Sequence, residues 1–336
     1  MADLTVVMLA YGEEPHLVDA VDAVLASAGV KIHLVLVDNG TTNPLVDDLG
    51  ARSGVTLLRP DENLGFTGGV NLGLAHATST FVGTVNSDAT VAPDALARLV
   101  DHLGDERVGI AGGLVLLADR PDVVNSAGNP LNVVGLSWAG RLGQPAGGVP
   151  PVQQVASASG ACLVLRRALW ERLGGFPEEF FAYLEDLDLC WRTWQQGLRV
   201  EVVAAAKVWH HYEFSRNPLK MYLLERNRLL FLSTVHERRT LAALALPAAA
   251  FEVAVAGLSV VQGWPRQKVD GWMWALRHRK WIRARRADIQ RERTVPDREL
   301  VHLLTTAVDP GISVPAVTPV LERVLAAYWR RVRRWL

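Results

Sequence analysis

The chain has 336 residues, of which 49% are hydrophobic, and it carries 35 basic and 35 acidic residues. This length exceeds one ordinary core and predicts a large α/β domain with an additional region. Residues 266–293 hold ten Lys and Arg against three acidic residues, a net charge of +7, so the remainder of the chain carries −7. This uneven distribution excludes a uniformly basic nucleic-acid binder and indicates a basic docking surface attached to an acidic catalytic body.

The first apolar run, residues 4–10, has the length of a strand and lacks the basic flank and cleavage site of a signal peptide. Strand-like runs recur at 32–37, 55–58, 81–85 and 108–117, and helical patterns lie between them at 17–25, 45–49, 71–77 and 93–103. Strands that alternate with helices predict a mostly parallel sheet with helices on both faces. Ligands bind such a sheet beyond the carboxyl ends of its strands.

Polar groups follow three of these strands, at the edge where a ligand is expected. Tyr11 follows the first strand, Asp38 follows the second, and Asn-Ser-Asp at 86–88 follows the strand at 81–85. Asp38 could accept a hydrogen bond from a nucleotide base, or it could only stabilise a turn. Asp88 is a hard oxygen ligand suited to magnesium or manganese bridging a diphosphate, and a turn residue is the alternative.

The middle of the chain is less regular. Residues 63–71 (NLGFTGGVN) form a glycine-rich loop whose backbone could approach a phosphate. They match neither G-x-G-x-x-G nor Walker A, so a tight turn is the alternative. Residues 118–152 show no sustained period and predict a long irregular loop, of the kind that is often functional. Strand character returns at 155–165, and a short helix pattern follows at 167–173.

Residues 180–197 (FFAYLEDLDLCWRTWQQG) combine three carboxylates with an apolar helix pattern. A helix that begins near Glu185 would bury its apolar face and present Glu185, Asp186 and Asp188 from its first turn. Acids at a helix N-terminus interact favourably with the helix dipole, so capping explains one or two of them. Three clustered carboxylates repel one another, which favours a metal, a cationic substrate group or proton transfer.

Two later features bear on metal binding. Strand-like runs at 200–203 and 207–209 lead to His210, which could complete a metal site or only pack near a tryptophan. Cys162 and Cys190 are only two and lie in different apolar segments, so they predict neither a disulfide framework nor a cysteine metal site. A reducing cytosol fits this cysteine content.

The motifs together form a specific series: Tyr11, VDNG at 37–40, ENLGF at 62–66, NSD at 86–88, FFAYLEDLDLCWR at 180–192, WHH at 209–211 and ERNR at 225–228. The series resembles the family-two inverting glycosyltransferases of the GT-A fold, in the branch that contains rhamnosyl- and galactofuranosyltransferases. The resemblance covers about residues 4–232. It implies a Rossmann-like, mostly parallel catalytic domain at residues 1–236.

The resemblance also implies roles for individual residues. Asp38 would bind the nucleotide base, and Asp186 would be the general base. Asp88 would bind Mg²⁺ or Mn²⁺, and His210 would assist the metal or the diphosphate. The other residues assigned in this way are Tyr11, Asn63, Gly65, Asn71, Asn86 and Arg226 at the donor, Glu185 beside the base, and Trp191 and Asp188 at the acceptor.

Two positions depart from the family pattern. Gly12 replaces the usual Asn after the first-strand Tyr, which removes one polar contact near the base. Asn86 replaces the first acid of the DxD-like triplet, so that Asp88 would carry most of the metal binding by itself.

The chemistry of sugar transfer agrees with these assignments. A divalent cation neutralises the departing diphosphate, and one carboxylate deprotonates the acceptor hydroxyl. One base suffices for inversion, whereas a retaining glycoside hydrolase requires two carboxyls. The resemblance implies that a rhamnose- or galactofuranose-like sugar moves from a dTDP- or UDP-sugar to a hydroxyl of a cell-surface glycan or a polyprenyl-linked acceptor.

Two alternatives belong to other classes of protein. A sugar nucleotidyltransferase shares the sheet architecture, but its Gly-rich signature with Arg and Lys is missing from residues 8–16. A non-enzymatic nucleic-acid binder would use the basic, tryptophan-rich tail. Steeply salt-dependent binding of oligonucleotides, without turnover of nucleotide sugars, would favour that alternative.

The C-terminal region, residues 237–336, is expected to be helical and to associate with an anionic membrane surface. Residues 241–264 are long enough to span a bilayer and carry one charge, Glu252, with Pro247 in their first third. A mid-membrane carboxylate and a helix-breaking proline favour a position in the interface. The Trp and basic residues that follow indicate anionic headgroups on the cytoplasmic face. The alternative is a helical cap with the tryptophans in its core, and the basic amphipathic stretch at 321–336 fits either.

Overall fold

The computed structural model describes residues 1–211, 217–308 and 318–336, and the chain divides into two compact units. The first, which we call the α/β unit, comprises Met1–Asn129, Ala139–Thr193 and Leu198–Phe214. The second, the helical unit, comprises Pro130–Trp138, Trp194–Gly197 and Ser215–Leu336. These structural limits do not test the functional boundary after residue 236, which stays a prediction.

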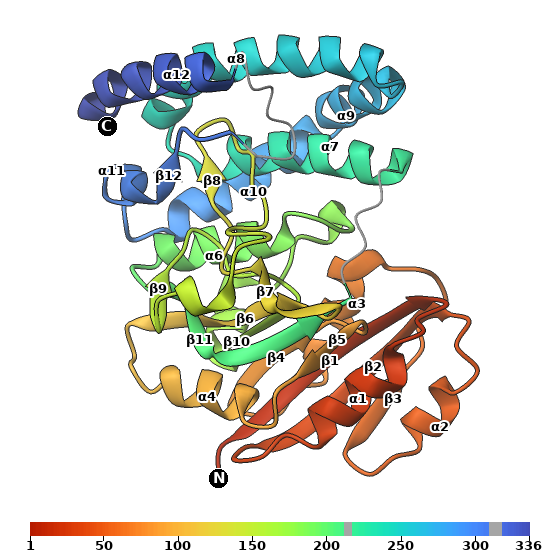
Figure 1. The fold of residues 1–336 in the computed structure, drawn as a ribbon. Helices are drawn as coiled ribbons and strands as arrows, with labels where there is room; N and C mark the ends of the chain where they lie inside the picture. The colour runs from red at the N-terminus through yellow and green to blue at the C-terminus, as the bar shows by residue number, and fades with distance from the viewer. Residues whose placement is uncertain (212–216, 309–317) are drawn as a thin grey trace. The chain divides into compact units, whose positions relative to one another are not determined.

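In the described part of the chain, one sheet of ten strands forms the centre of the α/β unit (Figure 1). In chain order its strands are β1 (Asp3–Gly12), β2 (Lys31–Thr41), β3 (Val55–Leu58), β4 (Phe81–Val85), β5 (Ala89–Val91), β6 (Val108–Leu117), β7 (Arg120–Ser126), β9 (Val152–Gln154), β10 (Cys162–Arg166) and β11 (Arg199–His210). The order across the sheet is β3-β2-β1-β4-β10-β6-β11-β5, with β7 on β6 and β9 on β11. Strands β3, β2, β1 and β4 are mutually parallel, and so are β6 and β11. The predicted mostly parallel sheet is therefore confirmed.

Helices pack closely on both faces of β1. The helices of this part of the chain are α1 (Leu17–Leu25), α2 (Val46–Gly50), α3 (Gly65–Ala75), α4 (Ala95–His102), α5 (Arg167–Leu173) and α6 (Glu185–Gln195). On one face, Leu4, Val6 and Met8 share a buried core with residues of α1 and α4. On the other face, a Cβ at Gly73 of α3 would lie 2.7 Å from a methyl carbon of Val7. The glycines of α3 therefore permit close packing of this helix on the sheet.

The structure corrects the prediction of a glycine-rich loop at residues 63–71. Helix α3 begins at Gly65, six residues before the expected start at Asn71. The Gly65 N–H donates to Asn63 Oδ1 at 2.8 Å, and the Leu64 N–H donates to Asn39 Oδ1 at 2.9 Å. These two asparagines satisfy two of the N–H groups that a helix start leaves unpaired, which helps the helix to begin in a glycine-rich sequence.

Three strand predictions also change. The expected irregular loop at 118–152 contains β7, because the chain turns back there and pairs antiparallel with β6. The strand expected at 155–165 is limited to β10, because the preceding residues leave the sheet and Ser157 bridges to Asn129 instead. The two runs at 200–203 and 207–209 belong to the single strand β11, whose register against β6 shifts between them.

The helical unit contains the expected C-terminal helices. They are α7 (Pro218–Val235), α8 (Arg238–Val261), α9 (Pro265–Arg277), α10 (Arg279–Glu292), α11 (Asp297–Leu300) and α12 (Thr318–Val332), and a short parallel pair joins β8 (Leu131–Asn132) to β12 (Leu304–Thr305). Asn217 caps α7 by accepting from the Lys220 N–H at 2.8 Å. Helix α8 continues through Pro247, so the proline does not end it.

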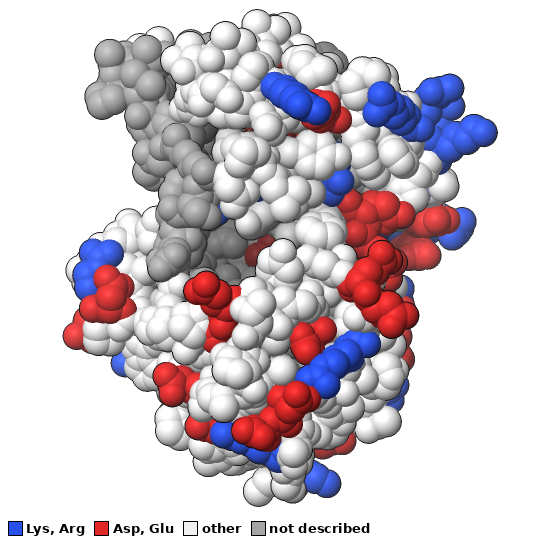
Figure 2. Space-filling model, turned by 90° about the vertical axis from the view of Figure 1, so that its right-hand side faces the viewer, with Lys and Arg blue, Asp and Glu red and all other residues white. Residues whose placement is uncertain are grey.

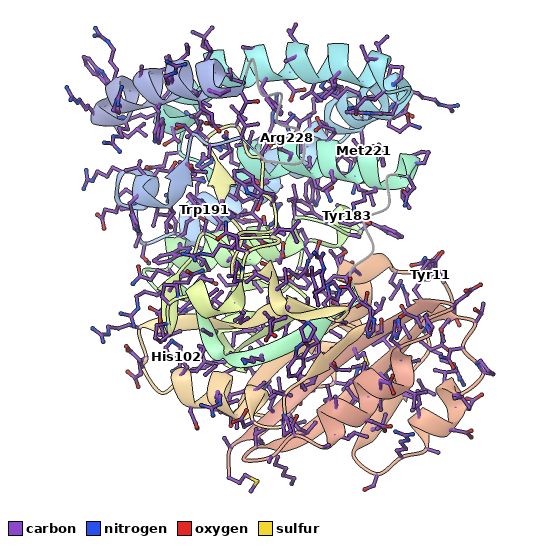
Figure 3. All side chains as sticks on the ribbon, in the orientation of Figure 1. Tyr11, His102, Tyr183, Trp191, Met221 and Arg228 are labelled. Carbon is purple, nitrogen blue, oxygen red and sulfur yellow. The ribbon has the colours of Figure 1, made fainter. Side chains whose placement is uncertain are left out.

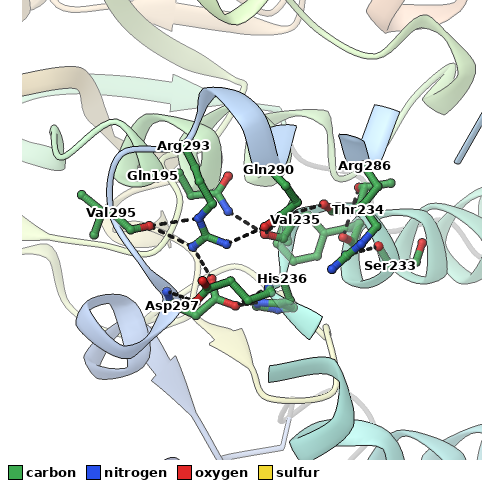
Figure 4. Close-up of polar contacts among 12 residues, drawn as sticks. Gln195, Ser233, Thr234, Val235, His236, Arg286, Gln290, Arg293, Val295 and Asp297 are labelled. Carbon is green, nitrogen blue, oxygen red and sulfur yellow. Dashed lines mark hydrogen bonds and ion pairs between the residues drawn. The ribbon is translucent and has the colours of Figure 1, made fainter. Parts of the chain in front are cut away.

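Polar side chains hold the C-terminal end of α7 (Figure 4). The carbonyl groups of residues 233–235 lack partners within the helix and accept hydrogen bonds from Arg286 and Gln290 of α10. Arg293 forms an ion pair with Asp297 at 2.6 Å, and both side chains are buried. Two arginines that the sequence assigned to a docking surface therefore have structural roles.

Four charged side chains of α7, α8 and α9 form a cluster that we call the buried ion quartet: Glu225, Arg228, Glu252 and Lys268. Arg228 (labelled in Figure 3) and Lys268 each pair with both carboxylates, and they are only 2% and 1% exposed. The Trp272 indole donates to Glu252 at 2.7 Å. The quartet balances two negative charges with two positive ones, and it holds α8 against α7 and α9.

The outer side of α8 remains apolar and exposed. Leu246, Val253 and Val260 are 68%, 75% and 67% exposed. Among the described residues, α8 is the one helix whose length and composition would allow it to cross a membrane. On the face drawn in Figure 2, neutral residues cover most of the helical unit, with Lys and Arg in small groups.

Candidate active site

Two carboxylates at the start of α6 make no ion pair with Lys or Arg in the described part of the chain. Glu185 is buried, and its Oε2 atom has no hydrogen-bond partner among the described residues. Asp186 is held by backbone groups: Oδ2 accepts from the Gly160 N–H at 3.0 Å, and Oδ1 accepts from the Leu187 N–H at 2.7 Å. We call Glu185 and Asp186 the unpaired acids.

Burial changes the acidity of both groups. It raises the pKa of Glu185 to about 8, with repulsion from Asp186 as the second cause. It also raises the pKa of Asp186, against the opposing effect of the hydrogen bonds from Gly160 and Leu187. Carboxyl groups with raised pKa values in a protein interior are suited to accepting a proton near neutral pH.

The third acid of the helix has a different environment. Asp188 is fully buried and pairs with Arg192 at 2.7 Å, and Arg192 also donates to the Gly175 carbonyl at 2.8 Å. Trp191 (labelled in Figure 3) is fully buried as well. Since neither side chain reaches the surface, the predicted direct contacts of Asp188 and Trp191 with an acceptor do not fit the structure. Asp188 instead anchors α6.

The segment before α6 has an unusual backbone. Phe181, Tyr183 and Leu184 have φ values of 63°, 71° and 66°, in the left-handed region that non-glycine residues rarely adopt. Each such residue costs free energy and persists only where its surroundings determine the conformation, which is frequent at functional sites. Three of them in four residues fix the direction from which α6 presents the unpaired acids.

Helix α3 supplies part of those surroundings. Asn71 makes two reciprocal hydrogen bonds with the backbone of Phe176, at 2.9 and 3.0 Å. The Thr67 N–H donates to the Phe181 carbonyl at 3.1 Å, and a Cβ at Gly65 would lie 2.4 Å from that oxygen. The sequence predicted donor contacts for Asn71 and Gly65. Those contacts stay predictions, and in the structure both residues hold the segment that leads to α6.

Asp88 and His210 lie side by side, because β11 pairs antiparallel with β5 and places His210 opposite Ala89. The His210 Nε2 atom lies 3.0 Å from Asp88 Oδ1, and its Nδ1 lies 3.0 Å from Asn125 Oδ1. The contact with Asn125 orients the imidazole ring, as outer partners of metal-binding histidines commonly do. Asn86 Oδ1 is buried near the same strand end and has no hydrogen-bond partner among the described residues.

These atoms suit a divalent cation that is bound together with its substrate. No group of three His, Cys, Asp or Glu side chains in the described part of the chain could hold a metal ion. Mg²⁺ typically takes one or two carboxylates from the protein and completes its shell with phosphate oxygens and water. A site made of Asp88 and His210 fits that mode and would depend on the diphosphate of a donor.

The carboxyl end of β2 carries a second polar group. Asp38 accepts hydrogen bonds from the Thr41 N–H at 3.0 Å and from Arg59 Nε at 2.8 Å. Burial alone would raise the pKa of Asp38, but these bonds outweigh burial and the pKa is lowered. Tyr11, at the end of β1, is 57% exposed (Figure 3). Asn63 was predicted to contact the donor, but its Oδ1 accepts from Asn39 and from the backbone.

The structure adds residues that no sequence motif indicated. Arg59 follows β3 and fixes Asp38, and the only signal was a basic residue at the end of the neighbouring strand. Glu14 accepts from the Tyr11 N–H at 3.2 Å, and burial raises its pKa. The imidazole of His16 stacks on that of His211, with ring centroids 3.4 Å apart. Arg226, predicted at the donor, lies buried in the helical unit with its guanidinium over the Trp274 ring.

The two cysteines take no part in this site. Cys162 and Cys190 are both free and fully buried. Burial raises the pKa of each thiol to about 12. Neither side chain forms a reactive thiolate near neutral pH.

The family model described as "Glycosyl transferase family 2" matches residues 5–174, just over half of the chain. The chain belongs to this family. The match includes Asp38, Asn86 and Asp88 but ends before the unpaired acids. The resemblance to family-two glycosyltransferases is therefore confirmed, and the comparison favours neither the nucleotidyltransferase nor the nucleic-acid binder.

Members of the family match over parts of the chain. A pre-mycofactocin glycosyltransferase of Mycobacterium tuberculosis is 30% identical over 184 residues, which cover 54% of this chain and 38% of that protein. The chain thus spans well under half of that relative's length. An N-acetylglucosaminyl-diphospho-decaprenol L-rhamnosyltransferase of the same species is 28% identical over 234 residues, covering 62% of this chain and 76% of that protein.

Solved structures with the same fold support the GT-A architecture. GalNAc-T7, crystallised with UDP, GalNAc and Mn²⁺, aligns with a TM-score of 0.58 at 14% identity, over 72% of this chain and 50% of that one. The mannosyltransferase PcManGT from Pyrobaculum calidifontis, in complex with GDP-Man and Mn²⁺, aligns with a TM-score of 0.52 at 20% identity, over 83% of this chain and 87% of that one. At these identities the likeness shows the fold alone.

Proposed function

We propose that this family-two chain is an inverting glycosyltransferase that moves a sugar from a nucleotide diphosphate to a hydroxyl group. The observation that carries the proposal is the pair of unpaired acids, because Glu185 Oε2 has no hydrogen-bond partner among the described residues and backbone N–H groups hold Asp186 beside it. Asp186, oriented by Gly160 and Leu187, would accept the proton of the acceptor hydroxyl. Glu185 would limit the charge of the pair by retaining a proton.

The donor would bind at the carboxyl ends of β1, β2 and β4. Asp38, held ionised by Arg59, would accept a hydrogen bond from the nucleotide base. Asp88 and His210 would hold Mg²⁺ or Mn²⁺. When bound, the cation neutralises charge on the departing diphosphate. The Mn²⁺ in the solved relatives supports this cofactor class.

The rhamnosyltransferase relative supports a narrower proposal about substrates. Its name describes transfer of L-rhamnose to a diphospho-decaprenol-linked sugar, and this chain covers 76% of its length. We accordingly propose a dTDP- or UDP-linked donor with a rhamnose- or galactofuranose-like sugar. The acceptor would be a polyprenyl-linked or cell-surface glycan.

For its location, we propose the cytoplasmic membrane surface, with α8 lying along the interface. The exposed apolar side of α8 supports attachment. The sequence argument treated Glu252 as an isolated charge, whereas Arg228 and Lys268 pair with it. These pairs give a stronger reason why α8 would not span the membrane. It could not enter the bilayer core without drawing charged groups of α7 and α9 with it.

A donor screen tests the proposed activity. The full chain is incubated with dTDP- and UDP-sugars, Mn²⁺ and a prenyl-linked acceptor, and nucleoside diphosphate release is measured. We expect release that stops with a chelator and with Asp186→Asn, whereas Asp101→Asn, an exposed acid on α4, keeps normal activity. Release that is unaffected by Asp186→Asn would contradict the assigned base, and no release from any donor would contradict the transferase.

Liposome flotation tests the proposed location. Wild-type protein is expected to float with anionic liposomes, and Val253→Asp on α8 should reduce the bound fraction severalfold. Leu219→Asp on α7 is the matched control, because Leu219 is also apolar and exposed, at 55%. Equal losses in both variants, or no flotation of the wild type, would contradict attachment through α8.

A further inference from the structure

A groove of about 390 Å³ lies within the helical unit, between α8, α12 and the segment that follows β8. Leu246, Phe251 and Leu258 line it from α8, and Leu321 and Val324 line it from α12. This volume falls in the range of small-molecule sites, and its walls are almost entirely hydrocarbon. Contact between this surface and water is unfavourable, so an apolar ligand that displaces the water would be favoured there.

Two of the polar side chains in the groove are already satisfied by the protein. Asn132 donates to the Ala307 carbonyl and accepts from the Val134 N–H at 2.8 Å. The Tyr328 hydroxyl donates to the Ala243 carbonyl at 2.7 Å. A ligand with many polar groups, such as an extended peptide, would therefore leave hydrogen bonds unmade on entering. The groove fits a hydrocarbon chain.

Four arginines follow the last groove residue of α12, in addition to Arg323 beside the groove. Helix α12 continues past Tyr328 to Arg330 and Arg331, and Arg333 and Arg334 follow, all exposed. Exposed arginines next to an apolar surface are typical of binding to lipid phosphates. The groove and these arginines together complement a molecule with one hydrocarbon chain and an anionic head.

We propose that this groove binds the hydrocarbon chain of a polyprenyl phosphate, with the phosphate held by the arginines at the end of α12. The inference rests on the proposed function, because it assigns a place to the lipid part of the acceptor. A polyprenyl phosphate carries one chain, as a single groove requires, whereas a bilayer phospholipid carries two.

Photo-crosslinking of the full chain tests the groove. The probe is a polyprenyl phosphate with a photoreactive group at the far end of its chain, and labelled peptides are identified by mass spectrometry. We expect labels in residues 246–258 and 318–328. Ala254→Trp on α8 and Val324→Trp on α12 fill the groove from two sides, so each should reduce labelling at least tenfold. Ala249→Trp, exposed on α8 outside the groove, should be labelled like the wild type.

The outcomes separate the possible errors. Labelling in the α/β unit, or undiminished labelling of both groove variants with native melting curves, overturns the groove. Unlabelled polyprenyl phosphate should suppress labelling, and phosphatidylglycerol vesicles at equal lipid concentration should not. Equal suppression by both lipids would show that the groove binds ordinary bilayer lipid. That result would overturn the proposal that it binds the polyprenyl chain of the acceptor. The crosslinking contains no sugar donor. A negative result therefore contradicts the groove but not the proposed transferase activity, which the donor screen tests.

Discussion

The two units bury carboxylates in opposite ways. In the α/β unit, Glu185 and Asp186 lie together, and backbone N–H groups are the partners of Asp186. In the helical unit, Glu225 and Glu252 are each paired with both Arg228 and Lys268. Burial without a nearby cation raises a carboxyl pKa, whereas a neighbouring cation opposes that effect, as Arg228 does for Glu252. The first arrangement keeps a proton exchangeable, and the second fixes helices in place.

This contrast predicts that the two clusters respond to different measurements. A change among the unpaired acids should alter the reaction first. A change in the buried ion quartet should alter folding first. Four tests, ordered by expected effect, examine the contrast.

The largest effect is expected for Asp186→Asn. Loss of a positioned general base typically lowers turnover by roughly 10²–10⁴-fold. Donor affinity should stay within about twofold, because the base contacts the acceptor and not the nucleotide. Steady-state kinetics and calorimetry with the nucleoside diphosphate measure the two quantities. If the variant loses its melting transition instead, Asp186 has a structural role like that of the buried ion quartet.

Lys268→Met should have the next largest effect, and on stability. Removing one cation leaves the buried Glu225 and the half-buried Glu252 with Arg228 alone, and breaking a buried pair typically costs about 3–5 kcal/mol. Urea unfolding measures the free energy of unfolding. Lys280→Met, an exposed lysine of α10, is the control and should change it by less than about 0.5 kcal/mol. If both variants unfold alike, the quartet does not stabilise the helical unit.

Asp88→Ala should reduce metal-dependent binding of the nucleoside diphosphate by at least roughly 10–100-fold, which is the loss typical of residues that only support a metal ligand. His210→Ala should reduce it less, because a single imidazole contributes less to a hard cation than a carboxylate does. Calorimetry with Mn²⁺ and UDP or dTDP measures the affinity of each variant. Unchanged binding in the Asp88 variant would remove this metal site.

Over a single pH unit, the smallest effect concerns Glu185. Glu185 has a pKa of about 8 when folded and an ordinary value of 4.5, so the folded protein binds this proton more tightly than the unfolded chain. Stability should therefore fall as pH rises between these values, by at most about 1.4 kcal/mol per pH unit. In Glu185→Gln this component should disappear from unfolding curves recorded at pH 5 to 8. Identical pH profiles would show that Glu185 is not a buried neutral acid.

The sequence predicted the sheet because apolar runs alternate with helical patterns, and it predicted the start of α6 at Glu185. It did not predict what the asparagines do. Asn71 bonds to the backbone of Phe176, 105 positions away, and a local motif does not show whether an amide meets a ligand or a distant carbonyl. Lys268 looked like surface charge for the same reason, since its partner Glu225 lies 43 positions earlier.

Burial of Cys162 and Cys190 has a practical consequence for labelling. The thiolate is the form of cysteine that attacks a thiol reagent, and both native thiols are buried and remain protonated in the folded protein. A cysteine introduced at Val253 on α8 should therefore be the one position that a maleimide dye reaches, with both native cysteines retained. For the same reason, the rate at which the unaltered chain is labelled should report how often its core opens and exposes Cys162 and Cys190.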